Sequence, residues 1–473
     1  MLLERYYDDT LAQATYLIAC ERSREAVIID PNRDVRRYVA AAAAHRIRIR
    51  FVTETHIHAD FLSGSRELSR ETRATLLLSG HGGADWSYDY AEADGARLVR
   101  DGESIDVGSV RLTVLHTPGH TPEHISFLVT DTAVGDRPMG MITGDFVFVG
   151  DVGRPDLLEK AAKVTGSMEG AARQLYASLQ KLTSFPDYLQ LWPGHGAGSA
   201  CGKALGAVPQ TTLGYERLFN PAFQQRSEDA FVRWELADQP EPPRYFARMK
   251  ALNREGPRAS EVTARDAMRA KDVEEALSRR LPVIDIRRPS EFAREHIPGT
   301  INIPLSKTFL SYVGTVLDYD KPLAIIARSF DEAHRALAQL ALIGHDHVGI
   351  ATIDVVQTMK KEGRAMASVP TIDPQALAAK LDTNGPRVVD VRGRSEWNHG
   401  HLPKATHIFL GDVVDRSAAF SKEEPIVVHC ESGTRSSIAA SLLMARGFTK
   451  VANLAGGFEA WREAGLPVSE EHS

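Results

Sequence analysis

Cysteine is scarce in this chain of 473 residues, which contains only Cys20, Cys201 and Cys430. Three widely separated cysteines cannot build the disulfide framework of a small secreted domain, and free thiols suit a reducing compartment. No apolar run approaches the ~20 residues that a membrane span needs. The first residues lack a basic segment, so we expect no signal peptide. These absences predict a cytoplasmic protein that does not enter a membrane.

Positive charge is not in excess either. The chain has 56 Lys and Arg residues against 62 Asp and Glu residues, a net charge of −6. A general nucleic-acid-binding protein would show clustered basic residues, so we expect no nucleic-acid partner. The length exceeds that of one ordinary domain, which predicts a multidomain protein.

The first half of the chain alternates short apolar runs with glycine-rich loops. Four of these runs are typical of strands: residues 25–31, 47–55, 110–120 and 124–130. Residues 155–182 have the apolar spacing of helices. The proline-rich, acidic stretch "ADQPEPPRY" (237–245) is typical of a linker. We therefore expect a first domain over residues 1–235 and a linker over 236–259.

Beyond this linker the chain repeats itself. "LPVIDIRRPSEFAREHIPGTINIP" (281–304) matches "PRVVDVRGRSEWNHGHLPKATHIF" (386–409), with Asp285 on Asp390 and Arg287 on Arg392. Each copy alternates apolar strands with helices, the pattern of a mainly parallel sheet covered by helices. A repeat of this length indicates two copies of a domain and not a solenoid. We expect these α/β domains over residues 260–365 and 366–473.

Histidines and aspartates gather in the glycine-rich loops that follow predicted strands of the first domain. They occur in "THIHAD" (His56, His58, Asp60), "HTPGHT" (His120), "TGD" (Asp145) and "PGHG" (His195). Neighbouring glycines allow the backbone to turn sharply at a strand end. Imidazole and carboxylate groups in such loops suit zinc or iron(II). Together these residues predict a metal centre.

These four motifs together resemble the metallo-β-lactamase superfamily, particularly its glyoxalase II and persulfide dioxygenase branches. The resemblance implies an αβ/βα sandwich with the metal at one edge. In the dinuclear members, a histidine follows the aspartate of the first motif and binds the second metal. Here that position is Phe61, which has no lone pair to donate.

A mononuclear centre is therefore the better hypothesis. By resemblance to persulfide dioxygenases, one iron(II) per chain should be held by His56, His120 and Asp145, which leaves positions open for substrate and oxygen. The resemblance makes His58, Asp60 and His195 groups that orient ligands or waters. The alternative is a glyoxalase II-like thioester hydrolase with a degraded second site, in which a single zinc activates water.

Other residues near these motifs are assigned more weakly by the sequence. His116 and His124 are candidates on spacing alone, and we expect them to end and begin strands outside the site. Cys201 follows His195 closely and either approaches the metal pocket or is a small buried apolar residue. We expect Cys20 to be structural.

A second reactive group is predicted in the last domain. In "PIVVHCESGTRSS" (425–437) an apolar strand leads into Cys430, and a loop ending at Arg435 leads into a helix. Backbone N–H groups and the positive end of the helix dipole both favour a thiolate there. Arg435 adds a fixed positive charge that can hold a sulfur oxyanion.

Four residues separate Cys430 from Arg435, one fewer than in a tyrosine phosphatase loop. This loop and its wider context, "VVDVRGRSEW", "GHLPKA" and "GFTKVANLAGGFEAW", resemble rhodanese sulfurtransferases, whose cysteine carries a persulfide. In the first copy, Ala327 falls on Cys430 and Glu332 falls on Arg435. The domain over 260–365 should therefore be inert in sulfur transfer and act as a spacer, a docking surface or a dimerisation element that makes a homo-oligomer.

As a whole, the chain resembles persulfide dioxygenase–rhodanese fusion proteins. The resemblance implies that a low-molecular-weight thiol persulfide and O2 are converted to sulfite and free thiol, and that Cys430 moves sulfane sulfur between thiol persulfide, sulfite and thiosulfate. No motif distinguishes glutathione, coenzyme A or another thiol as the carrier, and the direction of transfer stays open. A sulfur-sensing or scaffolding protein is the alternative outside enzymes.

Overall fold

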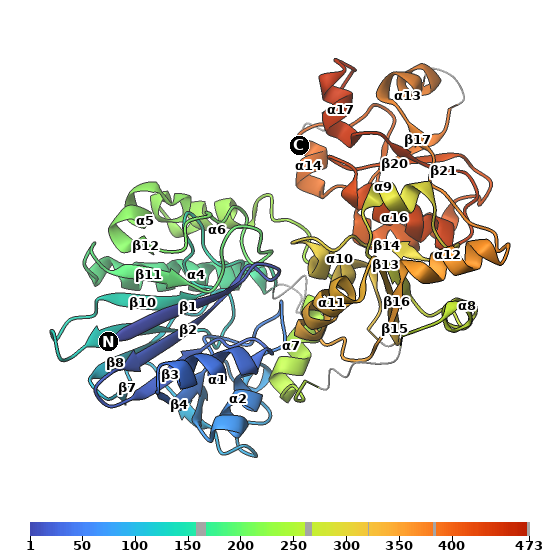
Figure 1. The fold of residues 1–473 in the computed structure, drawn as a ribbon. Coiled ribbons are helices and arrows are strands. Elements are labelled where there is room, and N and C mark those ends of the chain that lie inside the picture. The colour runs from blue at the N-terminus through green and yellow to red at the C-terminus, as the bar shows by residue number, and fades with distance from the viewer. Residues whose placement is uncertain (158–166, 261–266, 320, 382–384, 471–473) are drawn as a thin grey trace. The chain divides into compact units, whose positions relative to one another are not determined.

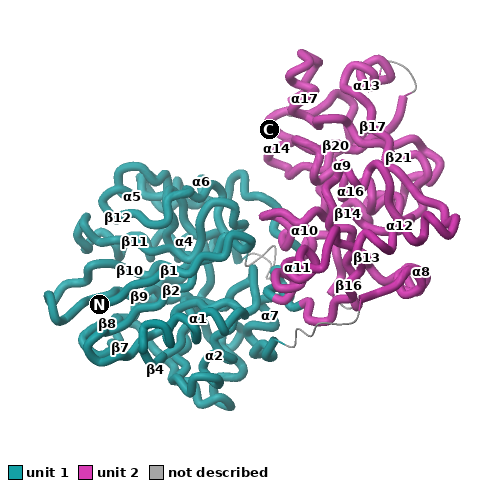
Figure 2. The backbone as a smooth tube through the Cα atoms, in the orientation of Figure 1, with its two compact units in different colours: residues 1–260, 342–344 teal, residues 261–341, 345–473 magenta. Residues whose placement is uncertain are grey.

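The computed structural model describes residues 1–157, 167–260, 267–319, 321–381 and 385–470. Part of the predicted helical stretch 155–182 forms α4 (Met168–Lys181), and residues 158–166 lie outside the described residues. The chain divides into two compact units, residues 1–260 with 342–344 and residues 261–341 with 345–473 (Figure 2). In the described ranges, no helix combines the length and apolar character of a bilayer span.

The first unit contains two six-stranded sheets. The first has the order β1-β2-β3-β4-β5-β6: Leu2–Asp8, Gln13–Cys20, Glu25–Ile29, Arg48–Thr53, Thr75–Ser79 and Arg97–Val99. The second has the order β12-β11-β10-β9-β8-β7: Thr211–Thr212, Gln190–Pro193, Gly140–Gly144, Ile125–Asp131, Val110–His116 and Ser104–Val107. The strands predicted over 25–31, 47–55, 110–120 and 124–130 correspond to β3, β4, β8 and β9.

The two sheets pack face to face, and helices cover their outer faces (Figure 1). Tyr16 and Val27 of the first sheet share one core with Phe127 and Trp192 of the second. The helices of the first unit are α1 (Val35–Ala44), α2 (Ser65–Thr72), α4, α5 (Leu213–Phe219), α6 (Glu228–Leu236) and α7 (Phe246–Glu255). α1 and α2 pack on the first sheet, and α4 and α6 pack on the second. The expected αβ/βα sandwich is confirmed.

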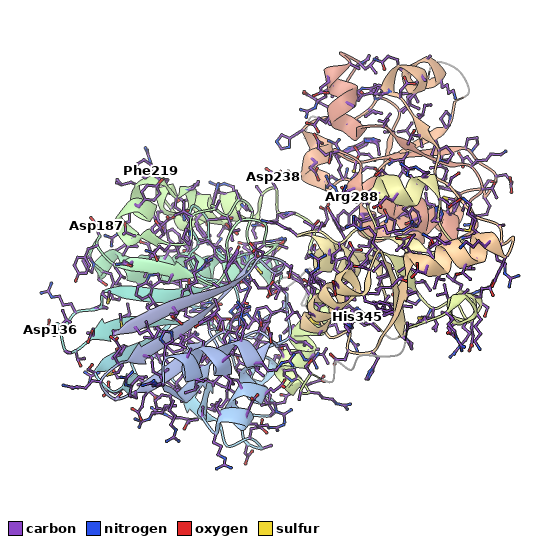
Figure 3. The ribbon with its side chains drawn as sticks, viewed as in Figure 1. Asp136, Asp187, Phe219, Asp238, Arg288 and His345 are labelled. Carbon is purple, nitrogen blue, oxygen red and sulfur yellow. The ribbon has the colours of Figure 1, made fainter. Side chains whose placement is uncertain are left out.

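Burial along the strands follows from this layering. β2 and β10 are buried at every residue because both of their faces are covered. Charged side chains remain in the loops at the rim, such as Asp136 between β9 and β10 and Asp187 before β11 (Figure 3). The loops that follow β4, β8, β10 and β11 carry the polar motifs, so the fold brings four segments remote in the sequence to one edge.

The segment expected to be a linker forms part of the first unit. Residues 246–255 fold into α7, and the compact unit extends to residue 260. Asn253 of α7 is buried, donates hydrogen bonds to the carbonyls of His58 and Phe61 at 2.7 Å each, and accepts one from the Ser63 N–H at 2.9 Å. Tyr245 Oη donates to the Asp60 carbonyl at 3.0 Å. Helix α7 therefore holds the loop that carries the first histidine motif.

The second unit contains two smaller sheets, one for each copy of the repeat, and every strand pair in them is parallel. The first sheet has the order β14-β13-β15-β16: Ile301–Asn302, Val283–Asp285, Leu323–Ala327 and Val348–Thr352. Its helices are α8 (Ala270–Ser278), α9 (Pro289–Arg294), α10 (Phe309–Val316), α11 (Phe330–Leu342) and α12 (Ile353–Lys361).

The second sheet of this unit has the order β17-β21-β20-β18-β19: Thr371–Ile372, Val451–Leu454, Ile426–His429, Arg387–Asp390 and Thr406–His407. Its helices are α13 (Pro374–Leu381), α14 (Arg394–Asn398), α15 (Val413–Arg416), α16 (Thr434–Ala445) and α17 (Gly457–Glu463). The two copies are joined by polar contacts of α16. Asn302 of β14 accepts a hydrogen bond from Ser437 Oγ at 2.8 Å and donates its N–H to Ser441 Oγ at 3.0 Å.

We expect Asn253→Ala to destabilise the first unit by about 1–3 kcal/mol, because buried carbonyls of the 58–63 loop lose their donor. The measurement is urea unfolding of the full chain. Glu255→Ala, at an exposed position of the same helix, is the matched control and should change the free energy of unfolding by less than about 0.5 kcal/mol. Equal effects of the two variants would contradict a specific role of α7 in holding the loop.

Candidate metal centre and cysteine loop

Three of the predicted ligands converge at the edge of the first sandwich. Ligand atoms of His56, His120 and Asp145 lie within 4.8 Å of one another, and all three residues are buried. Asp145 Oδ2 lies 3.8 Å from His56 Nε2 and 3.5 Å from His120 Nε2. His56 Nε2 and both Asp145 carboxylate oxygens have no hydrogen-bond partner among the described residues. Buried polar atoms are costly without a partner, so this donor set fits a divalent cation.

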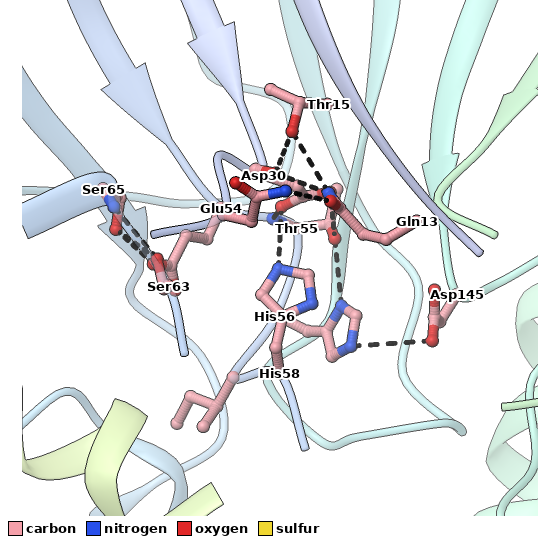
Figure 4. A network of polar contacts seen from close by, with 12 residues as sticks. Gln13, Thr15, Asp30, Glu54, Thr55, His56, His58, Ser63, Ser65 and Asp145 are labelled. Carbon is pink, nitrogen blue, oxygen red and sulfur yellow. Dashed lines mark hydrogen bonds and ion pairs between the residues drawn. The ribbon is translucent and has the colours of Figure 1, made fainter. Parts of the chain in front are cut away.

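A hydrogen-bond chain orients His56 (Figure 4). Thr55 Oγ1 donates to Asp30 Oδ2 at 2.9 Å, so its remaining lone pair accepts the Nδ1–H of His56 at 3.0 Å. His120 is oriented in the same way, since its Nδ1–H donates to the Arg154 carbonyl at 3.1 Å. In both rings this leaves the Nε2 lone pair directed at the pocket, as a metal ligand requires.

Burial and the neighbouring His58 and His120 rings lower the pKa of His56 well below its ordinary value. Burial likewise lowers the pKa of His120, although Asp145 opposes the shift. Both rings are therefore neutral near pH 7, which is the form that binds metals.

The three residues predicted to orient ligands or waters take different positions. His58 Nε2 lies 3.1 Å from Asp30 Oδ1 and so faces the hydrogen-bond network. Burial alone would lower the pKa of His58, but Asp30 raises it to about 9. Asp60 and His195 face the pocket instead, with His195 Nε2 3.3 Å from Asp60 Oδ2 and 3.5 Å from Asp145 Oδ1.

Phe61 supplies no ligand atom to this pocket. Its side chain is fully buried, and its ring packs against the His58 ring with centroids 4.4 Å apart. Cys201, which the sequence left open, lies at the pocket, where its sulfur and ligand atoms of Asp60 and His195 are within 4.8 Å of one another.

Sequence reasoning missed His124 as a residue of the site. Its Nδ1–H donates to Thr117 Oγ1 at 2.8 Å, and its Nε2 accepts the backbone N–H of Asp145 at 3.1 Å. Gly144 permits this contact: its φ is +52°, and an added Cβ would lie 2.8 Å from His124 Nε2. The position of His124 in the His120 loop was the available signal. His116, by contrast, ends β8 as expected.

The second predicted site lies between β20 and α16. Cys430 directly follows the strand, is buried, and its sulfur accepts the Gly433 N–H at 3.1 Å. Gly433 has a φ of +114°, a conformation that glycine adopts readily and that turns its N–H toward the sulfur. The helix that follows is 12 residues long and directs its positive end at this loop.

Arg435 is held by an ion pair in this structure. Its Nη2 donates to Glu396 Oε1 at 2.7 Å, and Glu396 also accepts the Gly393 N–H at 3.0 Å. Arg435 is therefore fixed beside the cysteine loop, with part of its charge balanced by Glu396. Its role in holding an anion stays a prediction.

The two copies share a buried Asp–Arg pair, but only the second has the cysteine loop. Arg392 binds Asp390 at 2.8 Å, and Arg287 makes the equivalent pair with Asp285. In the first copy β15 ends at Ala327, and Glu332 accepts the Arg328 N–H at 2.7 Å. The Glu332 carboxylate therefore takes up the first backbone N–H donor after β15, that of Arg328.

We expect Thr55→Val to weaken binding of a divalent metal about 10–100-fold, because it removes the hydroxyl that orients His56. The measurement is anaerobic competition with a chromophoric chelator. Thr183→Val, at an exposed position of the same unit, is the control. Unchanged affinity in Thr55→Val would show that the hydrogen-bond chain does not prepare the site.

Comparison with known proteins agrees with this architecture. The profile of the metallo-beta-lactamase superfamily matches residues 8–195, and that of the rhodanese-like domain matches residues 269–352 and 373–464. A crystal structure described as a metallo-beta-lactamase from Staphylococcus aureus subsp. aureus COL is 42% identical, with a TM-score of 0.69, over 74% of this chain and 99% of that chain.

Two curated relatives are similar to part of the chain. The mitochondrial persulfide dioxygenase ETHE1 of Bos taurus is 26% identical over 51% of this chain and 84% of its own length. The cytoplasmic hydroxyacylglutathione hydrolase of Arabidopsis thaliana is 31% identical over 38% of this chain and 62% of its own length. The sandwich, the two repeated α/β domains and these matches lead to one conclusion: the chain belongs to the metallo-beta-lactamase superfamily and carries two rhodanese-like domains after its metallo-beta-lactamase domain.

Proposed function

We propose that the chain is an iron(II) persulfide dioxygenase joined to a rhodanese sulfurtransferase. The observation that carries this proposal is the buried set of His56, His120 and Asp145 with Phe61 in place of a further histidine ligand. Two imidazoles and one carboxylate are the donor set that non-heme iron(II) oxygenases use. Similarity to a persulfide dioxygenase supports the same assignment.

Iron(II) bound by these residues would supply the redox chemistry by which a thiol persulfide, O2 and water give the thiol, sulfite and two protons. The chain's own contribution is to hold the ligands and exclude bulk water. The Phe61 ring packs on His58, and the Phe148 ring lies edge-on to His195 with centroids 6.3 Å apart. The Phe148 ring therefore adjoins the pocket at His195, and such apolar surface suits a soft sulfur substrate.

At the second site, Cys430 is proposed as the nucleophile. Its thiolate attacks the sulfane sulfur of thiosulfate, forms the new S–S bond of a cysteine persulfide and releases sulfite. A low-molecular-weight thiol such as glutathione or coenzyme A then attacks that sulfur and leaves as the persulfide, which returns the thiolate. The reverse sequence makes thiosulfate from sulfite. The Gly433 N–H supports charge on the sulfur, and Arg435 is proposed to hold the oxyanion.

The middle domain is proposed to be inert in this transfer. Ala327 has no nucleophilic atom, and Glu332 places negative charge where Arg435 lies in the other copy. Its role would then be that of a spacer, a docking surface or a dimerisation element. The three free cysteines suit a cytoplasmic location.

Similarity to a hydroxyacylglutathione hydrolase favours one alternative, a thioester hydrolase joined to the rhodanese. This activity would use a metal-activated water and would not consume oxygen. The two functions therefore differ in whether the reaction consumes O2.

Anaerobically purified, iron-loaded protein should consume O2 when given glutathione persulfide or coenzyme A persulfide, with sulfite or thiosulfate as product. Metal analysis of the same sample should find iron. Protein without iron should be inactive, because the redox chemistry requires the iron. Thioester hydrolysis by zinc-loaded protein, without O2 uptake on any persulfide tried, would overturn the dioxygenase proposal.

We expect Cys430→Ser to abolish thiosulfate:thiol transfer and to leave O2 uptake largely unchanged, because the hydroxyl is not a sulfur nucleophile at neutral pH. Cys20→Ser is the matched control. Cys20 is buried in β2, with its sulfur 3.3 Å from Ser109 Oγ, and has no part in either site. Loss of both activities in Cys430→Ser would contradict the separation of the two sites.

A further inference from the structure

Helix α16, whose N-terminus holds the cysteine loop, is buried on all sides along most of its length. Each residue from Ser436 to Leu443 is buried. A helix that covers only its own sheet leaves one face in solvent, and α11 of the first copy does so at His334 and Arg335. The outer face of α16 instead contacts β14 and α9 of the first copy (Figure 1). The middle domain therefore covers the helix that bears the reactive loop.

The first turn of α16 has no side-chain cap of its own. Its N-cap residue is Gly433, which has no side chain to accept a backbone N–H. Ser436 Oγ lies 3.5 Å from the Cys430 sulfur and donates to the Gly433 carbonyl at 3.1 Å. The Ser437 N–H donates to the same carbonyl at 3.1 Å. Because the Gly433 N–H donates to the Cys430 sulfur, the position of this turn sets the position of that donor.

Asn302 of β14 holds this turn from the first copy. Its Oδ1 atom accepts a hydrogen bond from Ser437 Oγ at 2.8 Å, and both residues are buried. The side-chain N–H groups of Asn302 donate to the carbonyls of Asp285 and Arg287 at 2.9 and 3.0 Å. One end of the amide is therefore anchored to the backbone of the buried Asp–Arg pair, and the other end binds α16.

The second copy shows which of these contacts the fold of one domain needs. Its residue equivalent to Asn302 is His407, since each lies opposite the aspartate of the buried pair in its sheet. His407 Nε2 donates to the Arg392 carbonyl at 2.8 Å, which is the bond that Asn302 also makes within its own copy. The amide oxygen that accepts from Ser437 is what asparagine adds. Its contact therefore serves the pairing of the two copies.

We propose that Asn302 is a positioning residue for sulfur transfer, through which the inert middle domain fixes the cysteine loop. Ser437 binds both Asn302 and the Gly433 carbonyl. The Gly433 N–H donates in turn to the Cys430 sulfur, so a shift of α16 would move this donor and weaken its support of a thiolate. The middle domain is then part of the transferase, beyond a spacer, docking surface or dimerisation element. This inference rests on the proposed role of Cys430 as nucleophile.

The test is the alkylation of Cys430 by iodoacetamide in the full-length protein, followed as a function of pH by mass spectrometry of the peptide that contains it. Only the thiolate reacts, so the midpoint of the profile reports how well the loop supports negative charge. Asn302→Ala and Ser437→Ala should each move the midpoint about 0.5–1 pH unit higher, the contribution of one hydrogen bond. The double variant should match Asn302→Ala alone, because both substitutions remove the same bond.

Two controls separate positioning from general stability. Gln357→Ala changes an exposed amide of the middle domain and should leave the midpoint unchanged. Val356→Ala opens a cavity in the core of the same domain. It should lower the free energy of unfolding without moving the midpoint.

Wild-type midpoints in both Asn302→Ala and Ser437→Ala, additive shifts in the double variant, or an equal shift in Val356→Ala would each overturn the proposal. If Asn302→Ala does not fold, Ser437→Ala alone decides, since it removes the other end of the same bond. Failure of the proposed transferase has a different signature. In that case wild-type protein with a reactive Cys430 would transfer no sulfur from thiosulfate to a thiol.

Discussion

The metal pocket depends on one buried carboxylate, that of Asp30 at the end of β3. Its oxygens accept hydrogen bonds from the Thr55 N–H at 2.6 Å and the Thr55 hydroxyl at 2.9 Å, and one of them lies 3.1 Å from His58 Nε2. The backbone carbonyl of Asp30 accepts hydrogen bonds from the side-chain amide of Gln13 and the hydroxyl of Thr15, at 2.8 Å each. Asp30 has a φ of +54°, which is uncommon outside glycine. This local strain is retained because the surrounding network determines the position of the residue.

The hydrogen bonds that begin at Asp30 also orient the side chains of the proposed metal ligands. Thr55 orients His56, and His124 holds the backbone of Asp145, so the donor atoms are directed before any cation binds. The cost is a set of buried polar atoms without partners, which a metal then satisfies. Divalent metals bind a given ligand set in a fixed order of affinity, so a protein selects one metal over another by the geometry and type of its ligands. Donor atoms that are oriented in advance provide that geometry.

The two rhodanese-like domains share a buried ion pair but differ in the loop at the end of the central strand. Both keep the Asp–Arg pair at the end of the equivalent strands β13 and β18, because that pair is buried and its loss would leave an uncompensated charge. They differ at the end of the central strand, where one copy has Cys430 with a backbone donor and the other has Ala327 beside a carboxylate. The same fold therefore accommodates two different loops at the end of this strand.

The sequence by itself determined the class of each domain, the internal repeat, the ligand motifs, Phe61 and the Cys430 loop, because each is a local pattern of residue type and spacing. Only the tertiary structure decided that Cys201 enters the pocket, that His124 holds Asp145, and that Asn253 of the expected linker supports the metal loop. These contacts join segments that are far apart in the chain. They arise only when two sheets and a helix pack together, and no periodicity within one segment encodes them.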